Sequence, residues 1–82
     1  MSNYLETPAA LAALSALAHE HRLAVFRLLV QAGPDGMAAG TIADALALPA
    51  SSMSFHLAHL HRAGLVDQRR DGRSLIYTAA YP

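Results

Sequence analysis

The chain has 82 residues, of which 54% are hydrophobic, 15% are charged and none is cysteine. That length has room for one small domain, so we expect residues 1–82 to form a single folded unit. Without cysteine, disulfides, thiolate zinc sites and iron–sulfur clusters within this chain are excluded. The formal charge is zero, but acidic residues outnumber arginine in residues 1–49 and arginine outnumbers acidic residues in 50–82. This asymmetry favours a polyanionic partner for the second half.

The apolar stretch from Pro8 to Ala18 has the composition of a secretory signal core. Nothing basic precedes it, however, and Glu6 stands where the positive segment should be. No apolar run approaches the roughly 18 residues that a membrane span needs. We therefore expect a cytoplasmic protein without a membrane segment.

Residues Pro8 to Ala18 are predicted to form a first helix, with Thr7 as N-cap and Pro8 at the first helical position. Leucines recur at helical spacing, and alanines make the remaining faces apolar as well. A domain this small has too little core to bury a helix with more than one apolar face. Such a helix therefore indicates that a second subunit covers part of it. We expect dimerisation through this region, at Leu5, Leu11 and Leu14.

Two further helices are predicted from apolar spacing. The second runs from Arg22 to Ala32 and is ended by the breakers of residues 33–36. The third runs from Thr41 to Leu48 and is broken by Pro49. The side chains expected inward are Leu23, Phe26, Leu29 and Val30 in the second helix, and Ile42, Ala43, Leu46 and Leu48 in the third.

The fourth predicted helix extends from Ser51 to Arg62. Met53, Leu57 and Leu60 form a single narrow apolar stripe, so the other faces stay open. A short helix, a tight turn and a second helix have the spacing of a helix-turn-helix.

A β-hairpin is predicted after the fourth helix. Val66–Arg70 and Arg73–Thr78 are two strand-like runs separated by Asp71-Gly72, a dipeptide typical of two-residue turns. The fold class is therefore mainly α with a small β-hairpin: a winged helix-turn-helix of four helices followed by a two-stranded wing.

This architecture indicates DNA binding. The major groove of B-DNA, about 12 Å wide, admits one helix, and a hairpin beside it can place arginines on the flanking backbone. Serine hydroxyls reach base edges or phosphates, an exposed phenylalanine packs on thymine methyls, and arginines hold phosphates. The candidate DNA-contacting residues are Ser51, Ser52, Ser54, Phe55, His56, His59, Arg62, Arg69, Arg70 and Arg73.

Several segments together resemble the ArsR/SmtB family of bacterial repressors: residues 17–23 (LAHEHRL), 51–57 (SSMSFHL), 63–66 (AGLV) and 69–73 (RRDGR), with Tyr77. The resemblance covers residues 9–78. It implies a homodimeric repressor on an inverted-repeat operator, released by a metal, metalloid or other inducer. It also makes residues 51–62 the recognition helix and the hairpin the wing.

The chain departs from that family at two points. Ala38 and Gly40 stand where members with a thiolate sensor on the third helix have cysteines, so that sensor is absent. The chain also ends at Pro82, where the family continues into a dimerising last helix.

The histidines could bind a metal or could be ordinary polar surface positions. His56 and His59, one turn apart, make at most half a metal site, and no nearby carboxylate completes it. Polar positions on a DNA-facing or inter-helix surface are preferred, with His19 as part of a helix cap and His21 as a solvated side chain. No metal site and no cofactor is predicted.

Three other functions are compared with a repressor. No catalytic triad, phosphate-binding loop or paired carboxylate is present, so an enzyme is excluded. A winged helix that binds another protein predicts an apolar patch on the fourth helix, where the sequence has serine, histidine and arginine. A constitutive DNA-binding regulator without a ligand remains an alternative.

Overall fold

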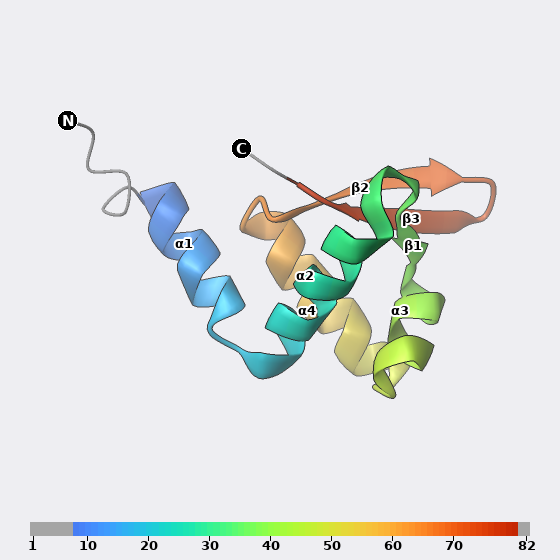
Figure 1. Cartoon of the computed structure of the whole chain (residues 1–82), viewed down its shortest axis with the longest axis horizontal. Helices are drawn as coiled ribbons and strands as arrows, with labels where there is room; N and C mark the ends of the chain where they lie inside the picture. Colours follow the sequence, from blue (N-terminus) through green and yellow to red (C-terminus); the bar gives the residue numbers. More distant parts are fainter. Residues whose placement is uncertain (1–7, 81–82) are drawn as a thin grey trace.

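The computed structural model describes residues 8–80. Within them, four α-helices precede a β-hairpin, as the sequence predicts (Figure 1). In chain order the elements are α1 (Pro8–Leu17), α2 (Glu20–Ala32), the 3-10 turn η2 (Gly33–Asp35), β1 (Met37–Ala38), α3 (Ala39–Leu46), α4 (Ala50–Arg62), β2 (Val66–Asp71) and β3 (Ser74–Ala79).

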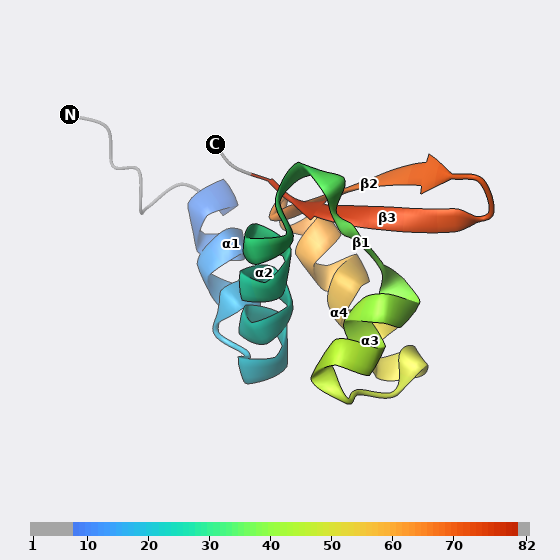
Figure 2. The same cartoon turned by 45° about the vertical axis from the view of Figure 1, so that its right-hand side comes forward.

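The helices form one layer and the sheet lies along one end of it. A turned view shows α1 beside α2 and α3 beside α4, with the hairpin projecting past the helices (Figure 2). The fold class predicted from the sequence, a winged helix-turn-helix, is confirmed. No helix of residues 8–80 is long and apolar enough to cross a membrane.

The core contains the predicted inward faces of α3 and α4. Ile42 and Ala43 of α3 are buried, and Leu46 and Leu48 pack against the core. From α4, Met53, Leu57 and Leu60 are fully buried. Burial of three large side chains at i, i+4 and i+7 anchors α4 along its whole length.

The inward face of α2 differs from the prediction. Val25 and Leu29 are buried, whereas Leu23 and Val30, both expected inward, are 39% and 38% exposed. Leu29 and Phe26 do pack in or against the core, as predicted. Apolar residues stand on two sides of this helix, and periodicity alone does not decide which of them face the core, so Leu23 and Val30 are corrections to the prediction.

The sheet has a strand that the sequence reading missed. β1, only two residues long, pairs antiparallel with β3, which makes the order β1-β3-β2. Gly36 precedes β1 with a φ of 68°, and a Cβ built there would lie 2.5 Å from the carbonyl oxygen of Tyr77. Only glycine permits this approach, because any other side chain would collide with the β3 backbone.

The hairpin turn lies one residue later than predicted. Asp71 pairs with Ser74, so Gly72 and Arg73 form the two-residue loop and Asp71 belongs to β2. Gly72 has a φ of 62°, and Arg73 is not among the residues of positive φ. A glycine of positive φ at the first loop position is typical of a type II′ turn, in which only that position needs positive φ. Arg73 therefore stands at the very tip of the hairpin.

The second and third helices start earlier than predicted, and the predicted cap of the first helix lies outside the described residues. α2 begins at Glu20 instead of Arg22, because the His19 ring Nδ1 accepts a hydrogen bond from the His21 backbone N–H and caps the helix. α3 begins at Ala39 instead of Thr41. The predicted cap at Thr7 lies outside residues 8–80.

Candidate nucleic-acid interface

The outward face of α4 is a continuous exposed stripe. Its positions recur at i, i+3, i+4, i+7 and i+11, which places them on one side of a helix. All are exposed, and Phe55, at 61%, is the most exposed large apolar side chain of residues 8–80. The outward stripe consists of Ser51, Ser54, Phe55, Ala58 and Arg62. It combines hydroxyl donors, one aromatic ring and one guanidinium, with no acidic side chain.

The turn before α4 fixes the direction of this stripe. Ala47 ends α3 in the left-handed conformation with a φ of 54°, and its N–H donates to the carbonyl oxygens of Ala43 and Asp44. Pro49 then stands in extended backbone immediately before α4. The turn and the buried stripe together hold α4 against α3 with its polar side outward.

His56 is a correction to the predicted interface. Its side chain is only 6% exposed, so it does not lie on an open face. One residue after Phe55 the helix has turned by about 100°, which carries His56 toward the start of α2. There its ring centroid lies 4.8 Å from that of His19 and 5.6 Å from that of His21. The expectation of a solvated His21 is therefore wrong, while that of a cap at His19 is confirmed.

His59 lies on the flank of α4 and is half-buried. It lines a depression of about 240 Å³ together with Ala12 and Ser15 of α1. Its Nδ1 is buried without a hydrogen-bond partner in the described part of the chain. Burial, and then the charges of Arg22 and Arg62, lower the pKa of the His59 imidazole. These causes favour the neutral form of the His59 ring at the α1–α4 junction over a cation on the outward stripe.

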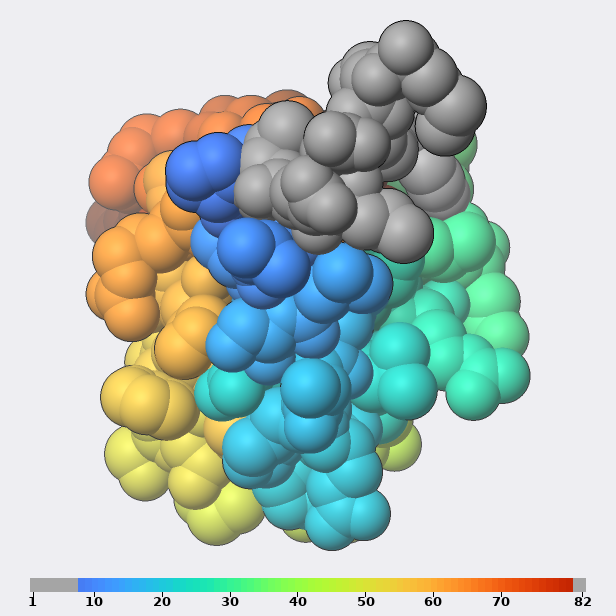
Figure 3. Space-filling model, turned by 90° about the vertical axis from the view of Figure 1, so that its left-hand side faces the viewer, coloured from blue at the N-terminus to red at the C-terminus, as the bar shows by residue number. Residues whose placement is uncertain are grey.

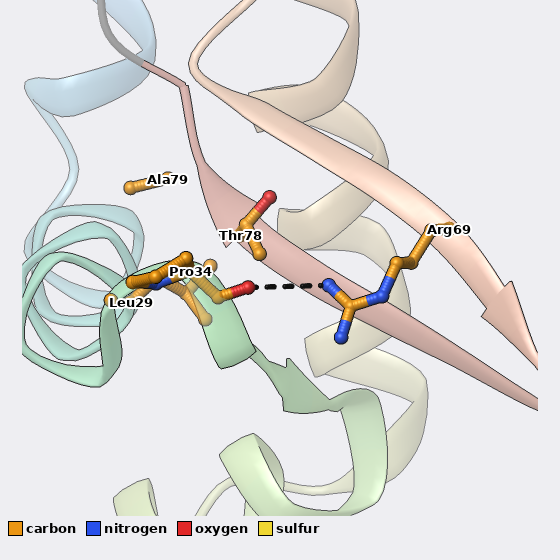
Figure 4. Close-up of a pocket in the computed structure, with 6 residues that line it drawn as sticks. Leu29, Pro34, Arg69, Thr78 and Ala79 are labelled. Carbon is orange, nitrogen blue, oxygen red and sulfur yellow. Dashed lines mark hydrogen bonds between the residues drawn. The ribbon is translucent and has the colours of Figure 1, made fainter.

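The hairpin arginines divide into two kinds. Arg69 donates to the carbonyl oxygen of Pro34 at 3.4 Å (Figure 4). It also donates to the carbonyl oxygen of Asp35 at 3.0 Å. It thereby ties β2 to η2. Arg70 and Arg73 are exposed, and within residues 8–80 neither guanidinium group has a hydrogen-bond or ion-pair partner. Two guanidinium groups at the end of the hairpin thus remain available for an external anion.

A shallow pocket of about 400 Å³ lies beside Arg69. Its wall is formed by α2, η2 and β3 (Figure 4), at Leu29, Gly33, Pro34, Thr78 and Ala79. In the described part of the chain, no three His, Cys, Asp or Glu side chains are arranged to hold a metal ion.

The remaining predicted site residues lie on two elements. Ser52 is half-buried on the flank of α4. Leu11 and Leu14 are 54% and 51% exposed on α1, which lies across the outer face of the molecule (Figure 3). Leu5 lies outside the described residues. The reading of the sequence missed the pairing of the His19 segment with α4, because nothing in the spacing of residues 37 positions apart indicates a contact.

Comparison with known proteins places these features in a family. Residues 17–69 match the family described as Helix-turn-helix domain. YgaV, an HTH-type transcriptional regulator of Escherichia coli, is 36% identical over 69 residues, which are 84% of this chain and 68% of that protein. The structure of HlyU from Vibrio cholerae is 34% identical with a TM-score of 0.79, and the match covers 89% of this chain and 76% of that one. A homodimeric winged helix-turn-helix DNA-binding domain from Mycobacterium bovis, a possible ArsR-family regulator, has 33% identity and a TM-score of 0.81, with 89% and 65% of the two chains covered.

The chain belongs to the ArsR family of winged helix-turn-helix regulators. In this ArsR-family domain, α3 and α4 are the helix-turn-helix and the β2–β3 hairpin is the wing. Membership also confirms the exclusion of an enzyme, since the relatives are transcriptional regulators. The chain spans between 52% and 68% of the length of the curated relatives it matches.

Proposed function

We propose that this chain is the DNA-binding part of a cytoplasmic transcriptional repressor that acts as a homodimer on an inverted-repeat operator. The observation that carries the proposal is the outward stripe of α4, which has no acidic side chain and lies on a helix anchored by its buried side. Beside it stands a hairpin whose terminal arginines have guanidinium groups without a partner within residues 8–80.

The outward stripe has the chemistry that reading a groove requires. Ser51 and Ser54 supply hydroxyls that donate to or accept from base edges, and the Phe55 ring packs against thymine methyl groups. Arg62, at the end of α4, neutralises a backbone phosphate. His56 has no part in this contact because it is buried.

The wing supplies charge that does not depend on sequence. Arg70 and Arg73 reach phosphates on either side of the groove that holds α4. Arg69 acts differently, because its bonds to Pro34 and Asp35 hold the wing at a fixed angle to the helices.

The exposed apolar side chains of α1, Leu11 and Leu14, support assembly as a homodimer. Burial of such leucines against a second copy is favourable by about 25 cal/mol per Å² of apolar surface. The domain from Mycobacterium bovis is homodimeric, which supports this assembly. Two-fold symmetry then requires half-sites about 10 bp apart, or a multiple of that spacing.

Repression, and release of the repressor from DNA by an inducer, are the most specific parts of the proposal. The ArsR resemblance implies a repressor that leaves DNA when a metal, metalloid or other inducer binds. A relative from Vibrio cholerae is named a transcriptional activator, so the direction of regulation needs its own test. A promoter fused to a reporter decides it: repression predicts lower expression when the chain is present, and higher expression would contradict it.

DNA binding is tested by fluorescence anisotropy across a salt series, with duplexes from upstream of the chain's own gene and scrambled duplexes. Arg70→Ala should weaken binding to both duplexes and reduce the salt slope by about 1. Ser54→Ala should instead reduce the preference for the upstream duplex. Arg27→Ala, which removes an exposed arginine from α2, is the matched control and should change neither.

If Arg70→Ala and Ser54→Ala each reduced the affinity for the two duplexes equally, that result would contradict the placement of α4 in the groove. Weak binding to every duplex, insensitive to salt, would favour the alternative of a winged helix that binds a protein partner. Preferential binding to the upstream duplex that no inducer relieves would favour a constitutive regulator.

A further inference from the structure

Three histidine rings meet where the start of α2 contacts α4. The centroid of His19 lies 5.4 Å from that of His21, and the two lie 4.8 and 5.6 Å from that of His56. We call these three residues the histidine cluster. His56 is more than nine-tenths buried, and its Nδ1 has no hydrogen-bond partner within the described residues. Packing of three ionisable rings around an unsatisfied buried nitrogen needs a functional explanation.

We propose that the histidine cluster is a proton-sensitive joint that holds α4 against the start of α2 while its rings are neutral and loosens when a proton is taken up. A neutral imidazole packs as an aromatic ring, but a buried imidazolium with no acceptor loses its hydration without compensation. Movement of α4 away from α2 restores that hydration.

The charges around His56 all oppose its protonation. Burial is the largest cause that lowers the pKa of His56, and repulsion from neighbouring bases adds to it. Those bases are His19, Arg22 and His21 on the α2 side, and His59 on α4 itself. α1 carries no charged residue between Pro8 and Leu17.

No carboxylate within residues 8–80 offsets this repulsion. Other charged residues on α2 and on the elements packed against α4 do not act on His56. They are Glu20, Arg27, Asp44, Asp67, Arg69, Arg70 and Asp71. Arg22 is held at the joint because its Nε donates to the carbonyl oxygen of Ala16 at 2.7 Å. The Arg22 guanidinium therefore cannot turn away from the cluster without losing that bond.

Protonation of the cluster has a second effect, on the cap of α2. The His19 Nδ1 accepts the His21 backbone N–H at 3.1 Å. In a charged imidazole both ring nitrogens carry hydrogen and neither accepts. A proton on His19 Nδ1 thus removes the α2 cap at the same place where a proton on His56 repels α4.

The sign of the linkage follows from the lowered pKa of His56. At pH values between the pKa of the folded state and the ordinary value of 6.5, the folded chain holds fewer protons on His56 than the unfolded chain, so the free energy of unfolding rises with pH there. The contribution of His56 to the free energy of unfolding is complete above 6.5 and is lost as pH falls through the lower pKa of the folded state. Asp and Glu stay ionised above about pH 5.5, so this window separates histidine from carboxylates.

The test is urea unfolding of the whole chain at several pH values from about 7.5 to about 5.5, a range in which histidine changes charge. The urea midpoint of the native chain should fall toward acid. His56→Gln, which keeps a neutral polar side chain that does not titrate, should lose a clearly smaller part of its midpoint over the same range. His61→Gln, on an exposed position of the same helix outside the cluster, is the matched control and should follow the native chain.

An equal fall in the native chain and in His56→Gln would overturn the proposal. If His56→Gln does not fold, NMR titration of the ring protons in the native chain takes its place: a His56 midpoint below 6.5 supports the joint, and one at or above 6.5 overturns it. A rise in stability when zinc ions alone are added, absent from His56→Gln, would show a metal site and would also overturn it.

The consequence for regulation rests on the proposed function. Loosening of α4 weakens the presentation of its outward stripe, so DNA affinity should fall toward acid in the native chain more than in His56→Gln. The unfolding measurement uses no DNA. Failure of DNA binding at every pH would therefore remove the proposed function while the proton-sensitive joint could still be established.

Discussion

α1 and α4 both lie on the outside of the helical layer, but they differ in how many side chains they bury and in the chemistry of their exposed sides. Of α1, only Ala16 is buried, and its exposed side carries leucine and no charge. α4 buries four side chains and exposes a polar stripe. A helix that reads a groove must be rigidly held, because its side chains are useful only in a fixed register. A helix that is completed by a second copy gains its remaining burial on association.

The largest expected effect is a difference in the free energy of unfolding lost when a leucine of α4 or of α1 is truncated. Leu57→Ala removes a fully buried side chain of α4 and should cost about 3 kcal/mol of the free energy of unfolding. Leu14→Ala removes a half-exposed side chain of α1 and should cost less than about 1 kcal/mol in the monomer. Urea unfolding at low protein concentration measures both. Similar losses from the two variants would show that α1 is anchored as firmly as α4.

The next effect concerns association. Leu11→Ser combined with Leu14→Ser should weaken dimerisation by at least tenfold, about 1.4 kcal/mol, because leucines lose burial in both copies. Sedimentation over a concentration series measures the change. Leu75→Ser, at a partly exposed position of β3, is the control and should leave the dimer intact. A native chain that stays monomeric at high concentration would contradict dimerisation through α1 of this chain.

The two helices also differ in how well the sequence predicts them. Met53, Leu57 and Leu60 of α4 form one stripe, so periodicity selects the buried side correctly. Phe55, two positions from both Met53 and Leu57 and so outside that stripe, is exposed as expected. α2 has two competing stripes, and the choice between Leu23 and Val25 depends on tertiary packing. Propensity and pattern cannot resolve such a choice when both faces are apolar.

Long-range contacts explain what the sequence does not predict in the candidate site. β1 exists only because β3 pairs with it, and two residues carry no strand pattern of their own. His56 leaves the predicted interface because the start of α2 covers it, a contact made by residues far apart in the chain. The bonds of Arg69 to Pro34 and Asp35 likewise cross from the wing to η2.

The smallest effect tests the most exposed apolar side chain of the outward stripe. Phe55→Ala should change the free energy of unfolding by no more than about 0.5 kcal/mol, because the ring is mostly in solvent. If the ring packs on thymine methyl groups, the preference for the upstream duplex should fall by about 1 kcal/mol, or roughly fivefold. Anisotropy with paired duplexes in which one thymine at a time is replaced by uracil, which lacks the methyl group, measures that contact directly. A native chain indifferent to every such replacement would remove the methyl contact. A large loss of stability in Phe55→Ala would show that α4 uses both its faces for folding and that its contrast with α1 is smaller than the exposed surfaces indicate.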